Sequence, residues 1–155
     1  MSVEAFLDTN VLVCAVSSAP EELAKKERAL ELIRHADFGL SAQVLQEFYV
    51  NVTRKIADPL EPSVAVELLD QFRQFPLVLT DYPLIVAGAE IALRFGISYW
   101  DGAIVAAAQF LGATMLYSED LSHGQNYGSV RVVNPFRNVL PDGVHDAESR
   151  GYGES

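Results

Sequence analysis

Apolar residues follow two patterns along the chain: short continuous runs, and stretches in which they recur every three or four positions. Short continuous runs favour buried strands, whereas recurrence at three and four favours helices with one apolar face. The runs predict strands at residues 5–7, 38–41, 77–79, 114–117 and 130–133. The recurring stretches predict helices at residues 20–36, 42–57, 63–74, 83–95 and 99–111.

The alternation of strands and helices predicts the fold. Strands that are separated by helices pair in parallel, through right-handed crossover connections. We therefore expect an α/β protein, a three-layer α/β/α sandwich with a central parallel sheet. In such folds, functional sites lie just beyond the carboxyl ends of the strands.

The length and composition indicate one globular domain followed by a tail. The chain has 155 residues, and 50% of them are apolar, which suffices for a packed core. We expect one folded domain over residues 1–137. Residues 138–155 show no apolar periodicity and carry a net negative charge, so we expect a mobile acidic C-terminal tail.

The formal net charge of −10 restricts the partners of the chain. Proteins that bind nucleic acid by bulk electrostatics carry basic patches, which argues against that kind of binding here. Part of the negative charge belongs to the tail, however. Clustered carboxylates can also bind divalent cations, and bound cations reverse the local electric field.

Cysteine content and hydropathy exclude several other classes. The single cysteine, Cys14, rules out an intramolecular disulfide and a zinc site with two cysteines. The longest apolar stretch, residues 103–113, is too short to cross a bilayer. The first residues lack the basic and apolar regions of a signal peptide. We expect a cytoplasmic protein without membrane association.

Four acidic residues occupy positions where this fold would place a site. Asp8 ends the first predicted strand, and Asp120 follows the strand that ends at Tyr117. Asp101 lies in the first turn of one predicted helix, and Glu47 lies in the first half of another. Because the carboxyl ends of parallel strands meet at one edge of the sheet, we expect Asp8 and Asp120 to lie close together.

Each acid also has an ordinary explanation. Asp8 and Asp101 suit the beginnings of helices, Glu47 suits a solvated helix surface, and Asp120 suits a turn. Their conjunction favours a site instead. Two carboxylates about 5 Å apart repel by about 3 kcal/mol at an effective dielectric constant of about 20, so a cluster must share protons or bind cations. Oxygen ligands alone favour Mg²⁺, with Mn²⁺ as a possible substitute.

Candidate substrate contacts come from the helix that carries Glu47. At about 100° per residue, Glu47 shares a strip of that helix with Val44, Asn51 and Arg54, which would bring a guanidinium beside the acids. Trp100 is a candidate for stacking on a base or for a place in the core or a dimer interface. The candidate phosphate contacts, which solvated helix charges would equally explain, are Arg54, Lys55 and Arg94.

The segments around the four acids resemble the PIN-domain family, and within it the VapC-like toxins of bacterial and archaeal toxin–antitoxin pairs. The resemblance covers residues 3–136 and keeps the order of the family's motifs. The matching segments are FLDTNVLV at 6–13, QEFY at 46–49, ISYWDGAI at 97–104 and LYSEDL at 116–121, followed by Gly124 and VNPF at 133–136.

The resemblance implies a metal-dependent ribonuclease with a three-layer α/β/α fold. It also implies that Asp8, Glu47, Asp101 and Asp120 form the acidic site. Asp8 and Asp101 would be the principal Mg²⁺ ligands, and Ser118 and Asn10 would support the site. VapC-like proteins are usually homodimers, each bound by a cognate antitoxin that blocks the site, so these partners are expected in addition to the RNA substrate.

Other enzyme classes fit the motifs less well. A haloacid-dehalogenase-like phosphotransferase needs a second Asp two residues after the first, and here that position is Asn10. A response-regulator receiver needs paired early acids and a late Lys on a strand, and neither is evident in this sequence. A dinucleotide-binding fold needs Gly-x-Gly-x-x-Gly after the first strand, and this motif is absent there. The remaining alternative is a catalytically silent PIN module that binds RNA or a partner as a scaffold.

Overall fold

The computed structural model describes residues 2–138, which fold around a six-stranded sheet in the order β3-β2-β1-β4-β6-β5. Every neighbouring pair is parallel except β5 and β6, which are antiparallel. The strands are β1 (Ala5–Leu7), β2 (Phe38–Ser41), β3 (Leu77–Val78), β4 (Met115–Tyr117), β5 (Asn126–Tyr127) and β6 (Val130–Val133). Residues 139–155, nearly all of the predicted C-terminal tail, lie outside the described part.

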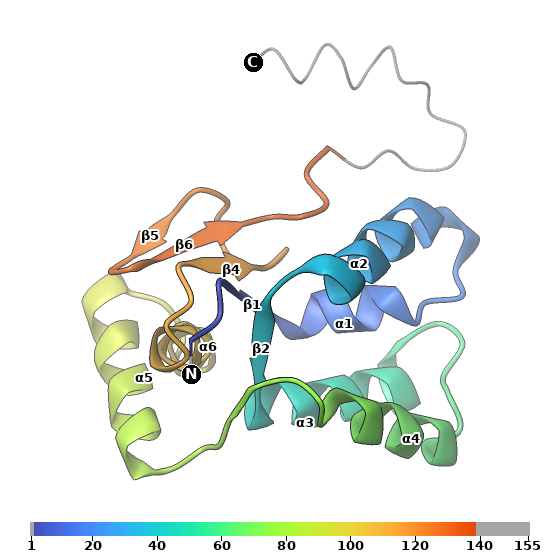
Figure 1. Cartoon of the computed structure of the whole chain (residues 1–155), viewed down its shortest axis with the longest axis horizontal. Coiled ribbons are helices and arrows are strands. Elements are labelled where there is room, and N and C mark those ends of the chain that lie inside the picture. Colours follow the sequence, from blue (N-terminus) through green and yellow to red (C-terminus); the bar gives the residue numbers. More distant parts are fainter. Residues whose placement is uncertain (1, 139–155) are drawn as a thin grey trace.

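Helices cover both faces of the sheet, as the predicted three-layer sandwich requires (Figure 1). From β1 to β3 the chain moves along the sheet in one direction, with α1 to α4 on one face. It then returns to place β4 on the other side of β1, and the connecting α5 and α6 cover the opposite face, as right-handed crossovers require. The helices are α1 (Thr9–Ala15), α2 (Leu23–His35), α3 (Ala42–Val50), α4 (Pro62–Phe72), α5 (Tyr82–Phe95) and α6 (Tyr99–Phe110), with a 3₁₀ turn at Pro20–Glu22.

The sheet prediction needs one correction. The sequence pattern predicted a parallel sheet and no strand between β4 and β6, but β5 adds an antiparallel edge to β6. This strand has only two residues and connects to β6 by a tight turn in which Gly128 adopts a φ of 64°. Two residues are too few to show an alternation of apolar and polar positions.

The sequence pattern also did not predict the bounds of α1. Five of its seven residues are buried, because the helix lies against the sheet and is covered by α2 and α3. A short helix that is buried nearly all round has no polar face, so its sequence shows a continuous apolar run and no helical period.

The predicted helix at residues 42–57 is interrupted. It is α-helical only to Val50, and Asn51–Lys55 (η2) form a π-helical turn. In this turn the backbone N–H of Ile56 donates to the carbonyl oxygen of Asn51, five residues earlier, at an ordinary hydrogen-bond distance of 3.1 Å. The change alters which side chains follow Glu47 on its face of the helix.

Close packing of α5 against α6 fixes the beginning of α6. A Cβ atom added to Gly102 would lie 2.3 Å from the carbonyl oxygen of Gly88 in α5, so only glycine permits this approach. Residues 102–108 of α6 are all buried. Asp101, directly before Gly102, is thereby held at the edge of the core.

Within residues 2–138, none of the helices combines the length and the apolarity that crossing a membrane requires.

Candidate functional site

The principal cavity lies at the carboxyl ends of β1 and β4, where the order of the sheet reverses, and its volume is about 640 Å³. This is the position where open α/β sheets bind ligands. Among the described residues, its lining contains eight acidic side chains and a single basic one, Lys55. The acidic side chains are Asp8, Glu21, Glu22, Glu47, Asp58, Asp101, Glu119 and Asp120.

Asp8 sits directly after β1 and is only 7% exposed. Its backbone N–H donates to the carbonyl oxygen of Tyr117 (2.9 Å), which continues the pairing of β1 with β4. Its carboxylate accepts the backbone N–H of Thr9 (2.7 Å) and the hydroxyl of Ser118 (2.7 Å). Asp8 therefore caps α1 and lines the cavity at the same time.

Two polar residues fix the loop after β4. The hydroxyl of Ser118, which is completely buried, accepts the backbone N–H groups of Asp120 (3.2 Å) and Leu121 (3.3 Å) while it donates to Asp8. The amide of Asn10 donates to the Asp120 carboxylate (3.1 Å) and accepts the backbone N–H of Glu119 (3.2 Å). Both side chains lie beside the acids as predicted, and their supporting role remains a proposal.

Glu47 reaches the cavity from α3. Its carboxylate accepts the hydroxyl of Thr9 (2.7 Å) and the amide of Gln43 (3.3 Å), one helical turn earlier. Gln43 also donates to the backbone carbonyl of Trp100 (3.2 Å), which links α3 to the beginning of α6. Glu47 is thus tied to both neighbouring elements of the site.

Asp101 reaches the cavity from the first turn of α6. Its backbone N–H donates to the hydroxyl of Ser98 (3.0 Å), the N-cap of that helix. Burial raises the pKa of the Asp101 carboxyl above its usual value, and the charges of Asp120 and Glu47 raise it further against the opposing effect of Ser98. Four acids from four different elements therefore interact through their charges.

The same charges act on Asp8. Burial raises its pKa from 3.8 to about 6, the hydrogen bonds from Ser118 and Thr9 oppose the rise, and the charges of Asp120 and Glu47 add to it. A carboxyl group that is buried among other carboxyl groups favours its neutral form unless a cation is bound.

The chemistry of these donors fits a hard divalent cation, although their present spacing is not that of an assembled metal site. Carboxylate oxygens are the ligands that Mg²⁺ prefers, and each Asp8 oxygen accepts one hydrogen bond and keeps a free lone pair. In the part of the chain that the structure describes, however, no three acidic, histidine or cysteine side chains are arranged around one point. The carboxylates of Asp8, Glu47 and Asp120 instead accept hydrogen bonds from the protein donors named above.

The three basic candidates differ in position. Lys55 lines the cavity, whereas Arg54 and Arg94 do not. Arg54 is exposed to solvent, and the guanidinium of Arg94 lies 5.0 Å from the centroid of the Phe95 ring. A contact of these two arginines with RNA stays a prediction.

Sequence reasoning missed Thr9 and Gln43, the two side chains that hold the Glu47 carboxylate. A signal for Gln43 existed, because residues four apart lie on one face of a helix. Thr9 had none, because its partner lies 38 positions away. The prediction that Trp100 could fill the core was wrong: its side chain is 63% exposed and borders the cavity.

A protein-family model matches most of the chain. The PIN domain model matches residues 5–126, most of the part just described. The chain belongs to the PIN-domain family. No curated protein matches the chain.

Several solved structures are similar to this PIN domain, and two of them are described as a toxin–antitoxin complex and as a toxin. FitAB bound to an IR36 DNA fragment contains a chain that is 24% identical, with a TM-score of 0.59, and the match covers 86% of this chain and 96% of that one. A toxin–antitoxin complex from Klebsiella pneumoniae gives 15% identity, a TM-score of 0.64, and coverage of 85% and 98%. VapC20 of Mycobacterium tuberculosis, described as a sarcin–ricin loop cleaving toxin, is 18% identical with a TM-score of 0.62. The match covers 76% of this chain and 90% of that one. At these identities the similarity establishes the fold.

Proposed function

We propose that this PIN domain is a magnesium-dependent endoribonuclease and the toxin of a toxin–antitoxin pair. The observation that carries the proposal is the convergence of Asp8, Glu47, Asp101 and Asp120, from four separate elements, on one cavity at the reversal point of the sheet. Membership of the PIN family and the similarity to toxins in solved complexes support the same conclusion.

In the proposed site, Asp8 and Asp101 are the principal Mg²⁺ ligands, with Glu47 and Asp120 completing the acidic set. A bound Mg²⁺, or Mn²⁺ in its place, supplies Lewis acidity and lowers the pKa of a coordinated water. Glu47 or Asp120 orients the attacking water, and no side chain needs to act as a nucleophile.

The surrounding residues keep these acids in place. The backbone of Thr9 and the hydroxyl of Ser118 hold Asp8, which is too buried to reorient freely. Asn10 connects Asp120, in the loop after β4, to α1, and the Thr9 hydroxyl donates to one oxygen of Glu47. Side chains that are restrained in this way lose less conformational freedom when an ion or the substrate binds, which favours binding.

The proposed partners are an RNA substrate, a cognate antitoxin and a second copy of the chain. One of the similar structures is described as a toxin–antitoxin complex, and three others are FitAB or VapBC complexes bound to DNA, which supports an antitoxin for this chain as well. The homodimer is proposed from the resemblance to VapC-like toxins. A toxin that cleaves cellular RNA would act in the cytoplasm.

An RNA-cleavage assay tests the proposal. We expect wild-type protein to cleave RNA with Mg²⁺ and to lose this activity in EDTA. Asp8→Asn and Asp101→Asn should each reduce the rate by about 100-fold or more, because each loses a charged ligand worth several kcal/mol in the transition state. Glu21→Gln is the matched control, since Glu21 lines the same cavity and its substitution removes the same charge.

Three outcomes would contradict the proposal. Equal cleavage by all four proteins would reject the site, and undiminished cleavage in EDTA would reject the metal. RNA binding without cleavage at any Mg²⁺ concentration would instead identify a silent PIN scaffold.

A further inference from the structure

The π turn after α3 decides which basic side chain faces the cavity. In an uninterrupted α-helix each residue advances about 100°, so Arg54, seven residues after Glu47, would return to within about 20° of the direction of Glu47. Lys55 would point about 80° away. This is the geometry that the sequence pattern implied for Arg54.

The structure reverses this assignment. A π turn bonds residue i to residue i+5, so each of its residues advances less, roughly 80°. After four α-helical steps to Asn51 and four π-helical steps, Lys55 returns to the direction of Glu47, and Arg54 falls about 80° short of it. The cavity lining agrees, since it contains Glu47, Asn51 and Lys55 at intervals of four residues and omits Arg54.

Lys55 is not engaged in neutralising any of the acids around it. The ion pairs within residues 2–138 are Lys25–Glu119, Arg28–Glu31 and Arg73–Asp70, so none involves Lys55. Lys25, by contrast, does neutralise an acid of this cavity, because its ammonium forms an ion pair with the Glu119 carboxylate. The ammonium of Lys55 therefore remains available to an anion that enters the cavity.

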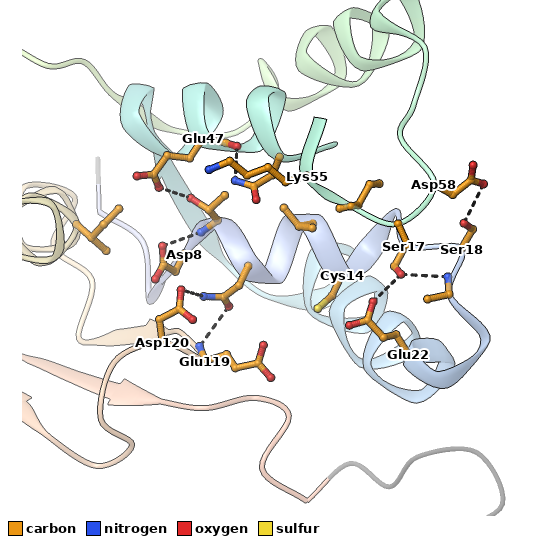
Figure 2. A pocket seen from close by; sticks show the side chains of 18 of the residues that line it. Asp8, Cys14, Ser17, Ser18, Glu22, Glu47, Lys55, Asp58, Glu119 and Asp120 are labelled. Carbon is orange, nitrogen blue, oxygen red and sulfur yellow. Dashed lines mark hydrogen bonds between the residues drawn. The ribbon is translucent and has the colours of Figure 1, made fainter. Parts of the chain in front are cut away.

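The location of Lys55 indicates which anion this is. Figure 2 shows Asp8, Glu47 and Asp120 at one end of the cavity, and Ser17, Glu22 and Asp58 at the other, with Lys55 between them. The cavity volume of about 640 Å³ is far larger than one metal ion needs and is in the range of sites for small organic ligands. An anionic ligand that extends from the acids along this cavity would pass Lys55.

We propose that Lys55 binds the backbone phosphate next to the one that is cleaved, and thereby holds the RNA strand along the cavity. The inference rests on the proposed function, because the four acids define where the cleaved phosphate lies. A lysine ammonium is a compact point charge that suits a phosphate in any orientation, which matches a backbone contact without base specificity.

Three variants test this role in the cleavage assay: Lys55→Gln, Lys55→Arg and, as the matched control, Arg54→Gln. Lys55→Gln should raise KM by about tenfold with little change in kcat, because the contact is made before and during the reaction alike. It should also reduce the slope of log(kcat/KM) against log[salt] by about 1, as expected for one lost phosphate contact. Lys55→Arg should restore most of the affinity, and Arg54→Gln should behave as wild type.

A Mg²⁺ titration separates this role from simple charge balance. If Lys55 only offset the acids, removing its charge would strengthen Mg²⁺ binding and leave KM for RNA unchanged, and that result would overturn the inference. Equal effects of Lys55→Gln and Arg54→Gln would overturn it as well, while leaving the proposed function intact. A wild-type protein without Mg²⁺-dependent cleavage would overturn both. Because Lys55 is exposed, the variants should unfold at the wild-type temperature, which a melting curve checks.

Discussion

The two walls of the cavity hold their charged groups by different means. On the wall made by β1 and β4, Asp8 is almost completely buried and is fixed by the pairing of the two strands, by Ser118 and by the backbone of α1. On the wall made by α3 and the π turn, Glu47 and Lys55 extend on flexible side chains from one helix face. Two hydrogen bonds, one from Thr9 and one from Gln43, restrain the Glu47 carboxylate.

The strand wall (β1 and β4) and the helix wall (α3 and the π turn) should therefore respond differently to amino-acid substitution. The strand wall is part of the core, so a change there alters the stability of the fold as well as the site. The helix wall can be altered through the phase of the helix, without disturbing the sheet. We therefore expect substitutions on the strand wall to change both stability and activity, and those on the helix wall to change activity more than stability.

The largest effect on stability should come from Asp8→Asn in EDTA. The folded-state pKa of Asp8 is about 6, above its ordinary value of 3.8. Because the folded state binds this proton more tightly, Asp8 costs stability as the pH rises from about 4 to about 6, and the full cost remains above that. The rise corresponds to about 3 kcal/mol, and Asn retains the cap of α1.

Urea unfolding of both proteins between pH 4 and pH 7 measures this effect. Asp8→Asn should gain up to about 3 kcal/mol over wild type near pH 7, and the gain should disappear near pH 4. A gain in the free energy of unfolding that does not depend on pH would mean that the negative charge of Asp8 does not destabilise the folded protein.

Ser118→Ala should have the next largest effect. The substitution removes the hydrogen bond to Asp8 and leaves two backbone N–H groups, those of Asp120 and Leu121, without their buried acceptor. We expect a loss of about 1–3 kcal/mol in the free energy of unfolding. Ser118→Thr offers a control that keeps the hydroxyl. Unchanged unfolding and cleavage for Ser118→Ala would show that the strand wall does not depend on this hydroxyl.

Thr9→Val should have the smallest effect, because it acts on the helix wall. The change keeps the shape of the side chain and removes only the hydrogen bond to Glu47, so stability should fall by about 1 kcal/mol or less. The cleavage rate should fall several-fold, and Thr9→Ser should recover it. A loss of stability as large as that of Ser118→Ala would contradict the distinction between the walls.

The strand wall could be predicted from the sequence to a large extent. A continuous apolar run that ends in Asp8, and another that leads to Ser118 and Asp120, predict two parallel strands with polar residues at their carboxyl ends. The sheet then brings these residues together whatever the details of the loops. The position of β5 could not be predicted, because a two-residue strand carries no periodic signal.

The helix wall could be predicted only in part. Helical spacing indicated that Glu47 lies away from the apolar face, but it assigned Arg54 to the face of Glu47. The π turn at Asn51–Lys55 transfers that place to Lys55. Such turns depend on how the end of a helix fits its neighbours, and no residue in this segment indicates one by itself.

Thermal melting in the presence of Mg²⁺ tests the central claim most directly. If the four acids bind the ion in the folded protein, the melting temperature of wild-type protein should rise steadily with Mg²⁺ concentration, and each tenfold increase above the dissociation constant should add about 1.4 kcal/mol. The double variant Asp8→Asn, Asp101→Asn should show no such rise. The claim that this cavity is a metal site would be contradicted if the wild-type protein melted at the same temperature in EDTA, in saturating Mg²⁺ and in saturating Mn²⁺.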